Sequence, residues 1–181
     1  MPINIIEKKI RKNPYYKGRA VNFNVDTVRL PDGKTAVREY LDHPGAVAVL
    51  PILKNGNIVM VRQYRYPIQT APLEIPAGKM HSKRDNPLAR AKAELKEETG
   101  YTGKINKMLS FWPCCAFSNE ELHIYLAKDL KKGKACPDED EFLRVEEVPF
   151  VKALKLAKSG KIKDAKTVIA ILHYASKVDK I

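Results

Sequence analysis

Three glutamates in the middle of the chain have a spacing that suits metal chemistry. Glu94, Glu97 and Glu98 stand at i, i+3 and i+4, so a helix would place all three carboxylates on one face. Neighbours at that spacing lie about 5–6 Å apart, and like charges there repel unless a cation lies among them. Mg²⁺ takes oxygen ligands, usually one or two carboxylates with water and phosphate oxygens. The spacing therefore indicates a divalent-metal site, and a solvated acidic helix face is the alternative.

Composition and charge limit the class of protein. The chain has 181 residues, 44% of them hydrophobic, which is enough for one well-buried core. Its formal net charge of +12 would attract phosphorylated anions. No apolar stretch is long enough to span a bilayer, and no signal peptide is expected. The three cysteines form no C-x-x-C pair, which is typical of a reducing compartment, so we expect a cytoplasmic protein without a zinc site or membrane contact.

Hydrophobic patterning predicts a mixed order of strands and helices. Asn55-Gly56 separates two apolar runs and predicts a hairpin with a type I′ turn between central strands. Asn86 and Pro87 predict the start of the helix that carries the glutamates, and Gly100 predicts its end. The other expected strands cover residues 19–30, 35–41, 46–53, 58–61, 105–112, 122–127 and 142–145, and two further helices cover residues 149–158 and 164–177.

Residues 78–101 resemble the Nudix box, whose pattern is G-x5-E-x7-R-E-U-x-E-E-x-G-U, where U is aliphatic or aromatic. The matching residues are Gly78, Glu94, Leu95, Glu97, Glu98, Gly100 and Tyr101. The flanking segments 43–47, 63–67 and 73–78 and the acidic run before Phe142 resemble the ADP-ribose pyrophosphatase branch of the family. The resemblance implies an α/β Nudix sandwich with a mixed sheet (residues 44–181), preceded by an N-terminal antiparallel sheet (residues 1–43) that in relatives builds a homodimer.

The resemblance also implies roles for particular residues. Glu94 and Glu98, with the backbone carbonyl of Ala77, would hold Mg²⁺ or Mn²⁺, and Glu97 would be a third ligand or would hold a neighbouring side chain. The water's proton would pass to the acidic loop, with Glu139 the preferred base and Glu141 the alternative or an additional ligand. The planar guanidinium of Arg65 suits a diphosphate. Glu74 and Arg38 complete the set of expected substrate contacts.

The sequence departs from the family pattern at three places. Ala93 occupies the position of the box arginine, although Arg90 and Lys92 are near enough for one of them to replace part of its charge. Asp85 corresponds to the first box glutamate if the preceding loop carries one extra residue. Cys115-Ala116 stands where ADP-ribose enzymes usually have Pro-Gly, so the motif indicates the reaction class more strongly than the substrate.

The expected function is hydrolysis of a nucleoside diphosphate linked to another moiety, with ADP-ribose giving AMP and ribose 5-phosphate as the leading case. A nucleotide sugar such as GDP-mannose, or another dinucleotide, is the alternative substrate. A different class of function is a catalytically impaired Nudix protein that binds a nucleotide or RNA. The paired box glutamates and the second acidic loop favour the enzyme, so a nucleic-acid partner is not expected.

Overall fold

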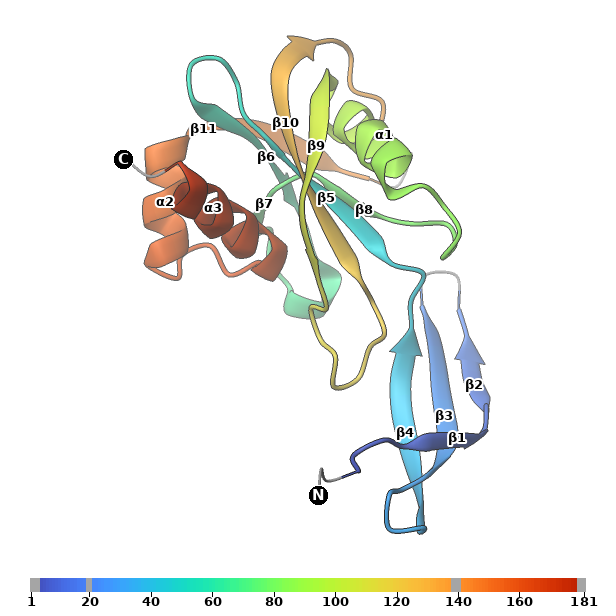
Figure 1. Ribbon diagram of the computed structural model, residues 1–181. Helices are drawn as coiled ribbons and strands as arrows, with labels where there is room; N and C mark the ends of the chain where they lie inside the picture. The colour runs from blue at the N-terminus through green and yellow to red at the C-terminus, as the bar shows by residue number, and fades with distance from the viewer. Residues whose placement is uncertain (1–3, 19–20, 138–140, 179–181) are drawn as a thin grey trace.

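The fold consists of a body of two sheets and three helices, from which an arm of short strands projects (Figure 1). The computed structural model describes residues 4–18, 21–137 and 141–178. The arm contains β1 (Lys8–Arg11), β2 (Pro14–Lys17), β3 (Asn22–Arg29) and β4 (Thr35–Asp42). The body strands are β5 (Ala46–Pro51), β6 (Asn57–Gln63), β7 (Leu73–Glu74), β8 (Ala77–Lys79), β9 (Tyr101–Phe111), β10 (Leu122–Lys132) and β11 (Leu143–Pro149). The helices are α1 (Pro87–Thr99), α2 (Phe150–Lys158) and α3 (Ala165–Lys177), and a short 3₁₀ helix covers Tyr66–Ile68.

The body is a sandwich of sheets between helices. One sheet has the strand order β8-β5-β10-β9, in which β5 and β10 run parallel and the other neighbours antiparallel. The other is the antiparallel sheet β11-β6-β7. Helix α1 packs on β5, β8 and β9, whereas α2 and α3 pack together on the opposite side (Figure 1). The expected α/β sandwich with a mixed sheet is confirmed.

Strand β5 lies between the two halves of the hydrophobic core. All six of its residues are buried, and alternate side chains point to opposite faces. Ala46, Ala48 and Leu50 belong to the cluster that contains residues of α2 and α3, whereas Val47 and Val49 belong to the cluster beneath α1. A strand covered on both faces needs apolar residues throughout, which explains the uninterrupted apolar run in the sequence.

The turn at Asn55-Gly56 differs from the expected type I′ hairpin. Gly56 has a φ of 81°, but Asn55 does not take a positive φ. The Gly56 N–H donates to the Leu53 carbonyl at 3.0 Å, and the Leu53 N–H donates to Asn57 at 2.8 Å. Beyond one bridge between Ile52 and Ile58, the two strands separate into different sheets. They diverge because β5 pairs with β8 and β10, while β6 pairs with β7 and β11.

The three helices begin and end close to their predicted residues. The Asn86 side chain accepts hydrogen bonds from the N–H groups of Leu88 (3.0 Å) and Ala89 (3.2 Å), and Gly100 ends α1 with a φ of 76°. The Asp164 side chain caps α3 by accepting from the Thr167 N–H. No helix among the described residues is both long and apolar enough to cross a membrane.

The arm is an antiparallel sheet with β3 at its centre. Strands β3 and β4, which fall on the strands expected at residues 19–30 and 35–41, form a hairpin with eight paired residues on each side. Strands β1 and β2 follow one another along the other edge of β3. The side chains of β1 and β2 are all exposed. Neither strand buries one face, so neither has the alternation of apolar and polar residues by which a strand is predicted.

Candidate active site

Two of the three box glutamates are buried on α1. Glu94 and Glu98 are each only 3% exposed, whereas the side chain of Glu97 is 42% exposed. One helical turn separates the buried pair, so both carboxylates lie on the same side of α1. This burial is inconsistent with the alternative that they form a solvated acidic face.

The start of the box lies directly against these carboxylates. The Ala77 N–H donates to Glu98 Oε2 at 3.1 Å. A Cβ atom added to Gly78 would lie 1.6 Å from Glu94 Oε1, which is far inside van der Waals contact. Position 78 therefore accepts only glycine while Glu94 keeps this place. Strand β8 and helix α1 together form a cradle around the two acids.

The electrostatics of the cradle suit a divalent cation. Burial, together with the charge of Glu94, raises the pKa of Glu98 to about 8. Two carboxylates held this close in a buried setting are stabilised when a cation lies between them. Among the described residues, no group of three or more His, Cys, Asp or Glu side chains forms a metal cluster. Mg²⁺ does not require one, because two carboxylates with backbone, water and phosphate oxygens can complete its shell.

Arg90 provides the guanidinium that the box lacks at Ala93. Its Nη2 contacts the Glu94 carboxylate, and its Nη1 lies 3.3 Å from Glu97 Oε2. Its Nε donates to the Lys79 carbonyl at 3.2 Å. Of the two candidates considered from sequence, Arg90 makes these contacts. Glu97 therefore contacts the same arginine that contacts Glu94.

Arg65 and Glu74 form a paired contact at the end of β6 and on β7. Arg65 donates from Nε and Nη2 to the two carboxylate oxygens of Glu74, both at 2.9 Å. Lys166, at the start of α3, donates to the same carboxylate and to Asp164 Oδ1 at 2.8 Å. Burial alone would raise the pKa of Glu74, but hydrogen bonds from Arg65 and Lys166 hold it below its ordinary value. The hydrogen bonds to Glu74 raise the pKa of Arg65.

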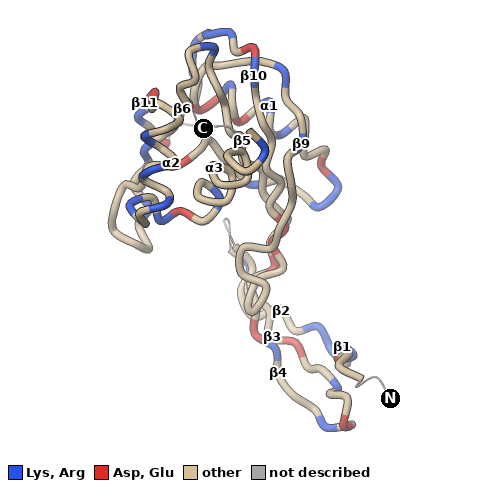
Figure 2. Tube along the Cα trace, turned by 60° about the vertical axis from the view of Figure 1, so that its left-hand side comes forward, with Lys and Arg blue, Asp and Glu red and all other residues tan. Residues whose placement is uncertain are grey.

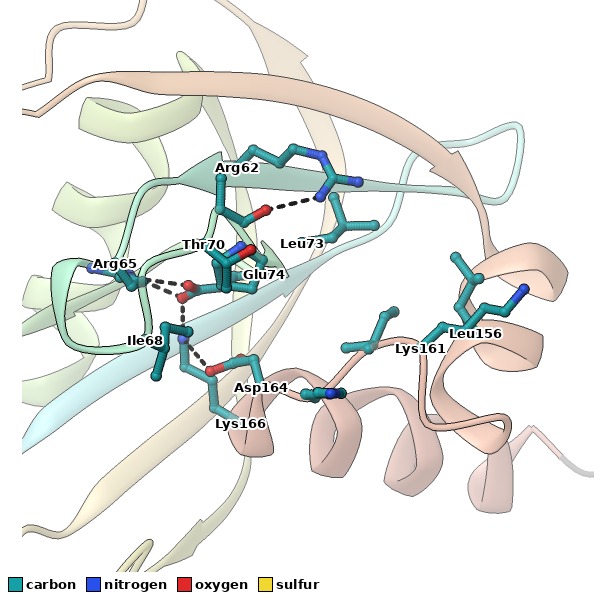
Figure 3. Close-up of a pocket in the computed structure, with 14 residues that line it drawn as sticks. Arg62, Arg65, Ile68, Thr70, Leu73, Glu74, Leu156, Lys161, Asp164 and Lys166 are labelled. Carbon is teal, nitrogen blue, oxygen red and sulfur yellow. Dashed lines mark hydrogen bonds and ion pairs between the residues drawn. The ribbon is translucent and has the colours of Figure 1, made fainter.

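Two cavities meet at this charged group. The smaller one, of about 330 Å³, is lined by Arg65, Ala77, Gly78 and Lys166, with Phe111 and Pro113 on another wall. The larger one, of about 860 Å³, lies between β6, β7 and the loop before α3 (Figure 3). We place the candidate active site at the smaller cavity because Ala77 and Gly78, at the start of the box, line that cavity and not the larger one.

The other predicted residues differ in whether the structure brings them to the box glutamates. Arg38 lies on β4 of the arm, where its guanidinium pairs with Glu7, so this chain does not bring it to its own box. The charge of Glu141 acts on Glu98 and contributes to its raised pKa, which places Glu141 near the cradle. Glu139 lies outside the described residues. Asp85 organises the preceding loop by accepting from the N–H groups of His81 (2.7 Å) and Ser82 (2.9 Å).

Two residues of the charged group around Glu74 were not among the site residues predicted from sequence. In the sequence, Asp164 and Lys166 lie only at the start of the helix expected over residues 164–177, where charged side chains are common. The weak signal was that this helix begins with a charged pair although it is otherwise largely apolar. Nothing in the local pattern indicated that its first turn would meet Glu74, which is 92 residues away from Lys166.

Comparisons with known proteins agree with this geometry. A family model described as the NUDIX domain matches residues 42–170. The chain is 44% identical over 170 residues to the ADP-ribose pyrophosphatase of Bacillus subtilis (strain 168), covering 92% of this chain and 91% of that protein. The same identity and coverage relate it to the methanol dehydrogenase activator of Bacillus methanolicus. A solved structure described as an ADP compounds hydrolase superposes with a TM-score of 0.81 at 17% identity, covering 97% of each chain, which shows a shared fold.

Proposed function

The chain belongs to the Nudix family, and from that premise we propose that it hydrolyses ADP-ribose to AMP and ribose 5-phosphate. The reaction class is that of a pyrophosphatase acting on a nucleoside diphosphate linked to another moiety. The name of the Bacillus subtilis relative supports ADP-ribose as the substrate. GDP-mannose and other dinucleotides are the competing substrates.

The observation that carries this proposal is the juxtaposition of two buried carboxylates with a cationic fork. Glu94 and Glu98 lie against Ala77 and Gly78 at the start of β8. Arg65 lines the same cavity as Ala77 and Gly78, and its charge acts on Glu98. A diphosphate placed there would meet a cationic side chain on one side and the carboxylate cradle on the other.

Glu94, Glu98 and the Ala77 carbonyl would hold Mg²⁺ or Mn²⁺. When bound, such an ion neutralises charge on the diphosphate and lowers the pKa of water. Arg65 orients the diphosphate through Nη1, while Glu74 fixes the edge of the same guanidinium formed by Nε and Nη2. This arrangement limits the motion of Arg65 before the substrate arrives.

The bonds that form and break in the hydrolysis define the role of the acidic loop. Water attacks one phosphorus atom, and its proton passes to the carboxylate of Glu139, or to Glu141 if that residue is the base. The bond between the same phosphorus and the bridging oxygen breaks, and the bridging oxygen leaves on the other phosphate. With ADP-ribose, the two phosphate monoesters are AMP and ribose 5-phosphate.

Replacement of Glu98 tests the site directly. We expect Glu98→Gln to lower kcat by about 100-fold or more, because the amide cannot supply a charged ligand, while the circular dichroism spectrum is unchanged. Glu121→Gln, at an exposed acid outside the cradle, is the matched control. Chromatography of the products from ADP-ribose, GDP-mannose, NADH and a dinucleoside polyphosphate identifies the substrate. Undiminished turnover in Glu98→Gln would show that the cradle is not the active site.

A paired comparison distinguishes the two candidate bases. Glu139→Gln should lower kcat more than Glu141→Gln, and the effect of Glu139→Gln should diminish at high pH, where hydroxide replaces the need for a base. The reverse order would assign the base to Glu141. Equal and small effects would remove the acidic loop from the mechanism.

We further propose a homodimer in the cytoplasm, with residues 1–43 as the dimerisation region and residues 44–181 as the hydrolase domain. Exposed apolar side chains on the arm support the interface; they are Ile5, Ile6, Ile10, Tyr15, Tyr16 and Val37. A dimer would also give Arg38 a substrate to contact, because the arm of one copy could reach the site of the other. The three free cysteines support a reducing compartment.

A further inference from the structure

The segment that leads into the acidic loop lies on the C-terminal end of α1. The acidic loop, residues 137–142, follows this segment on the way from β10 to β11. The Gly133 N–H donates to the Gly100 carbonyl at 2.8 Å, and the Cys136 N–H donates to the Glu97 carbonyl at 2.9 Å. Figure 1 shows the chain running beside α1 after it leaves β10. The box and the acidic loop are therefore joined by main-chain hydrogen bonds.

The end of α1 is suited to hold another segment. The last four carbonyls of a helix, which here include that of Glu97, have no donor within the helix and need one from elsewhere. Gly100 gives the segment room, since a Cβ atom added to it would lie 2.7 Å from both the Ala135 nitrogen and the Gly133 oxygen. A side chain at position 100 would push the segment away. The contact therefore depends on the glycine of the box pattern.

The far side of the acidic loop is also fixed. Strand β11 begins by pairing with Gln63 at the end of β6, two residues before Arg65. Only residues 137–142 lie between this pairing and the contact with α1. Glu141 lies in this span, and its charge acts on Glu98. A short span with both ends fixed limits where its carboxylates can lie.

We propose that Cys136 is a positioning residue for the hydrolysis, because its N–H holds the acidic loop in place beside the carboxylate cradle. The proposal rests on the proposed function and deepens it by saying what places the base. Glu97 would then serve both groups of acids. Its side chain contacts Arg90, which contacts Glu94, and its carbonyl holds the loop. The role belongs to the main-chain N–H of Cys136 and not to the thiol.

Proline at position 136 removes this donor and leaves every acid in place. Cys136→Pro lacks the N–H, whereas Cys136→Ala keeps it and removes only the thiol. Residue 136 precedes Pro137, so it is biased toward the extended backbone that proline also adopts. Lys134→Pro controls for proline itself, because the Lys134 N–H makes no hydrogen bond within the part of the chain that the structure describes.

Steady-state kinetics give the first measurement. Cys136→Pro should lower kcat by about 3- to 10-fold, the size expected when one hydrogen bond that orients a catalytic group is lost, and should change the KM for ADP-ribose by less than about twofold. Cys136→Ala and Lys134→Pro should each change kcat by less than about twofold. The loss of kcat should shrink at high pH, where hydroxide replaces the need for a base. Combined with Glu139→Gln or Glu141→Gln, whichever removes the base, Cys136→Pro should have no further effect.

Amide hydrogen exchange tests the same contact without turnover. Residues 141–145 should exchange faster in Cys136→Pro than in the wild type, and at the wild-type rate in Cys136→Ala. If Cys136→Pro does not fold, glycine insertions replace it. One glycine inserted after Cys136 changes the spacing between the contact and the carboxylates and should lower kcat, whereas one inserted after Lys134 keeps that spacing and should not.

Failure of this role and failure of the proposed function give different results. Wild-type kcat in Cys136→Pro, or an equal loss in Lys134→Pro, would overturn the role of Cys136 while the enzyme remains. An undiminished effect of Cys136→Pro in both Gln variants would also overturn it, because the base would then not be what is positioned. A wild-type protein that hydrolyses no nucleotide in the substrate panel would overturn the proposed function, and exchange in residues 141–145 would still decide whether the Cys136 N–H orders the loop.

Discussion

Arg90 contacts the box glutamates from a position on α1 that differs from that of the family's box arginine. The family pattern places arginine immediately before Glu94, where this chain has Ala93. Arg90 lies one turn before Glu94 and therefore on the same side of α1. Its contacts with Glu94, Glu97 and the Lys79 carbonyl link three parts of the box.

We predict that Arg90→Ala lowers kcat by about 10-fold or more, because Glu94 loses the cation that orients it. Lys92→Ala removes the same charge from the other candidate position and should change kcat by less than about twofold. The double variant Arg90→Ala/Ala93→Arg should regain part of the loss, since it returns arginine to the family position. Steady-state kinetics on all three would contradict the assignment if Arg90→Ala behaved like Lys92→Ala.

Glu98 makes the stability of the metal-free protein depend on pH. Its pKa rises from 4.5 to about 8 on folding, mainly through burial and then through the charge of Glu94. The folded state therefore keeps a proton that the unfolded chain releases between these values. The contribution of this group to unfolding free energy is fully present below pH 4.5 and is lost as the pH rises through about 8.

In EDTA, wild-type thermal stability should therefore fall from about pH 5 to 9 more steeply than that of Glu98→Gln, whose amide does not titrate. Over the same interval, Mg²⁺ affinity of the wild type should rise by up to about tenfold per pH unit, because binding displaces the proton. Thermal unfolding and calorimetry provide the two measurements. Parallel stability profiles for the two proteins would show that Glu98 does not retain its proton.

At the scale of elements, Asp42 connects the arm to the body. Its carboxylate accepts from Asn119 Nδ2 at 2.7 Å and pairs with Lys83 at 3.2 Å and Lys12 at 3.3 Å. Strand β4 thus meets the loop before α1 and the loop between β9 and β10. The hydrogen bond from Asn119, with those from the two lysines, keeps the pKa of Asp42 well below its ordinary value despite partial burial.

We predict that Asp42→Ala loosens the junction and speeds amide hydrogen exchange in β4, with a loss of about 1–3 kcal/mol in unfolding free energy. The contribution of Asp42 should be present above pH 3.8 and disappear as the pH falls further, because its pKa is lowered on folding. Asp32→Ala, at an exposed turn residue paired with Lys34, is the control. Equal exchange rates in the two variants would assign the junction to other contacts.

Elements with strong local signals were predictable from sequence, and their partners were not. Asn86, Pro87 and Gly100 predicted the limits of α1 because caps act through neighbouring backbone groups. The Asn55-Gly56 signal predicted a turn but not the separation of β5 and β6, which depends on pairing with distant strands. The sequence placed Glu94 and Glu98 on one face of a helix, but their burial and the Lys166 contact with Glu74 arise only from tertiary packing.

At the scale of the whole molecule, the arm and the body differ in how they are stabilised. The body has two clusters of buried residues on either side of its sheets, and neither cluster includes a residue of the arm. Figure 2 shows the arm extended away from the body, with lysines and arginines on both. An extended sheet with exposed apolar side chains is more stable when another surface covers it.

We predict that a second copy of the chain packs on the exposed apolar side chains of the arm. Wild-type protein should have a solution mass of twice 20.5 kDa by light scattering, and Val37→Lys should shift it toward the monomer, because a charge would be buried at the interface. Lys34→Ala, at the exposed β3–β4 turn, should leave the mass unchanged. If the arm of one copy completes the site of the other, activity should fall with the loss of dimer and recover at higher protein concentration. A fully active wild-type monomer of 20.5 kDa would contradict both the interface and the role of Arg38 in it.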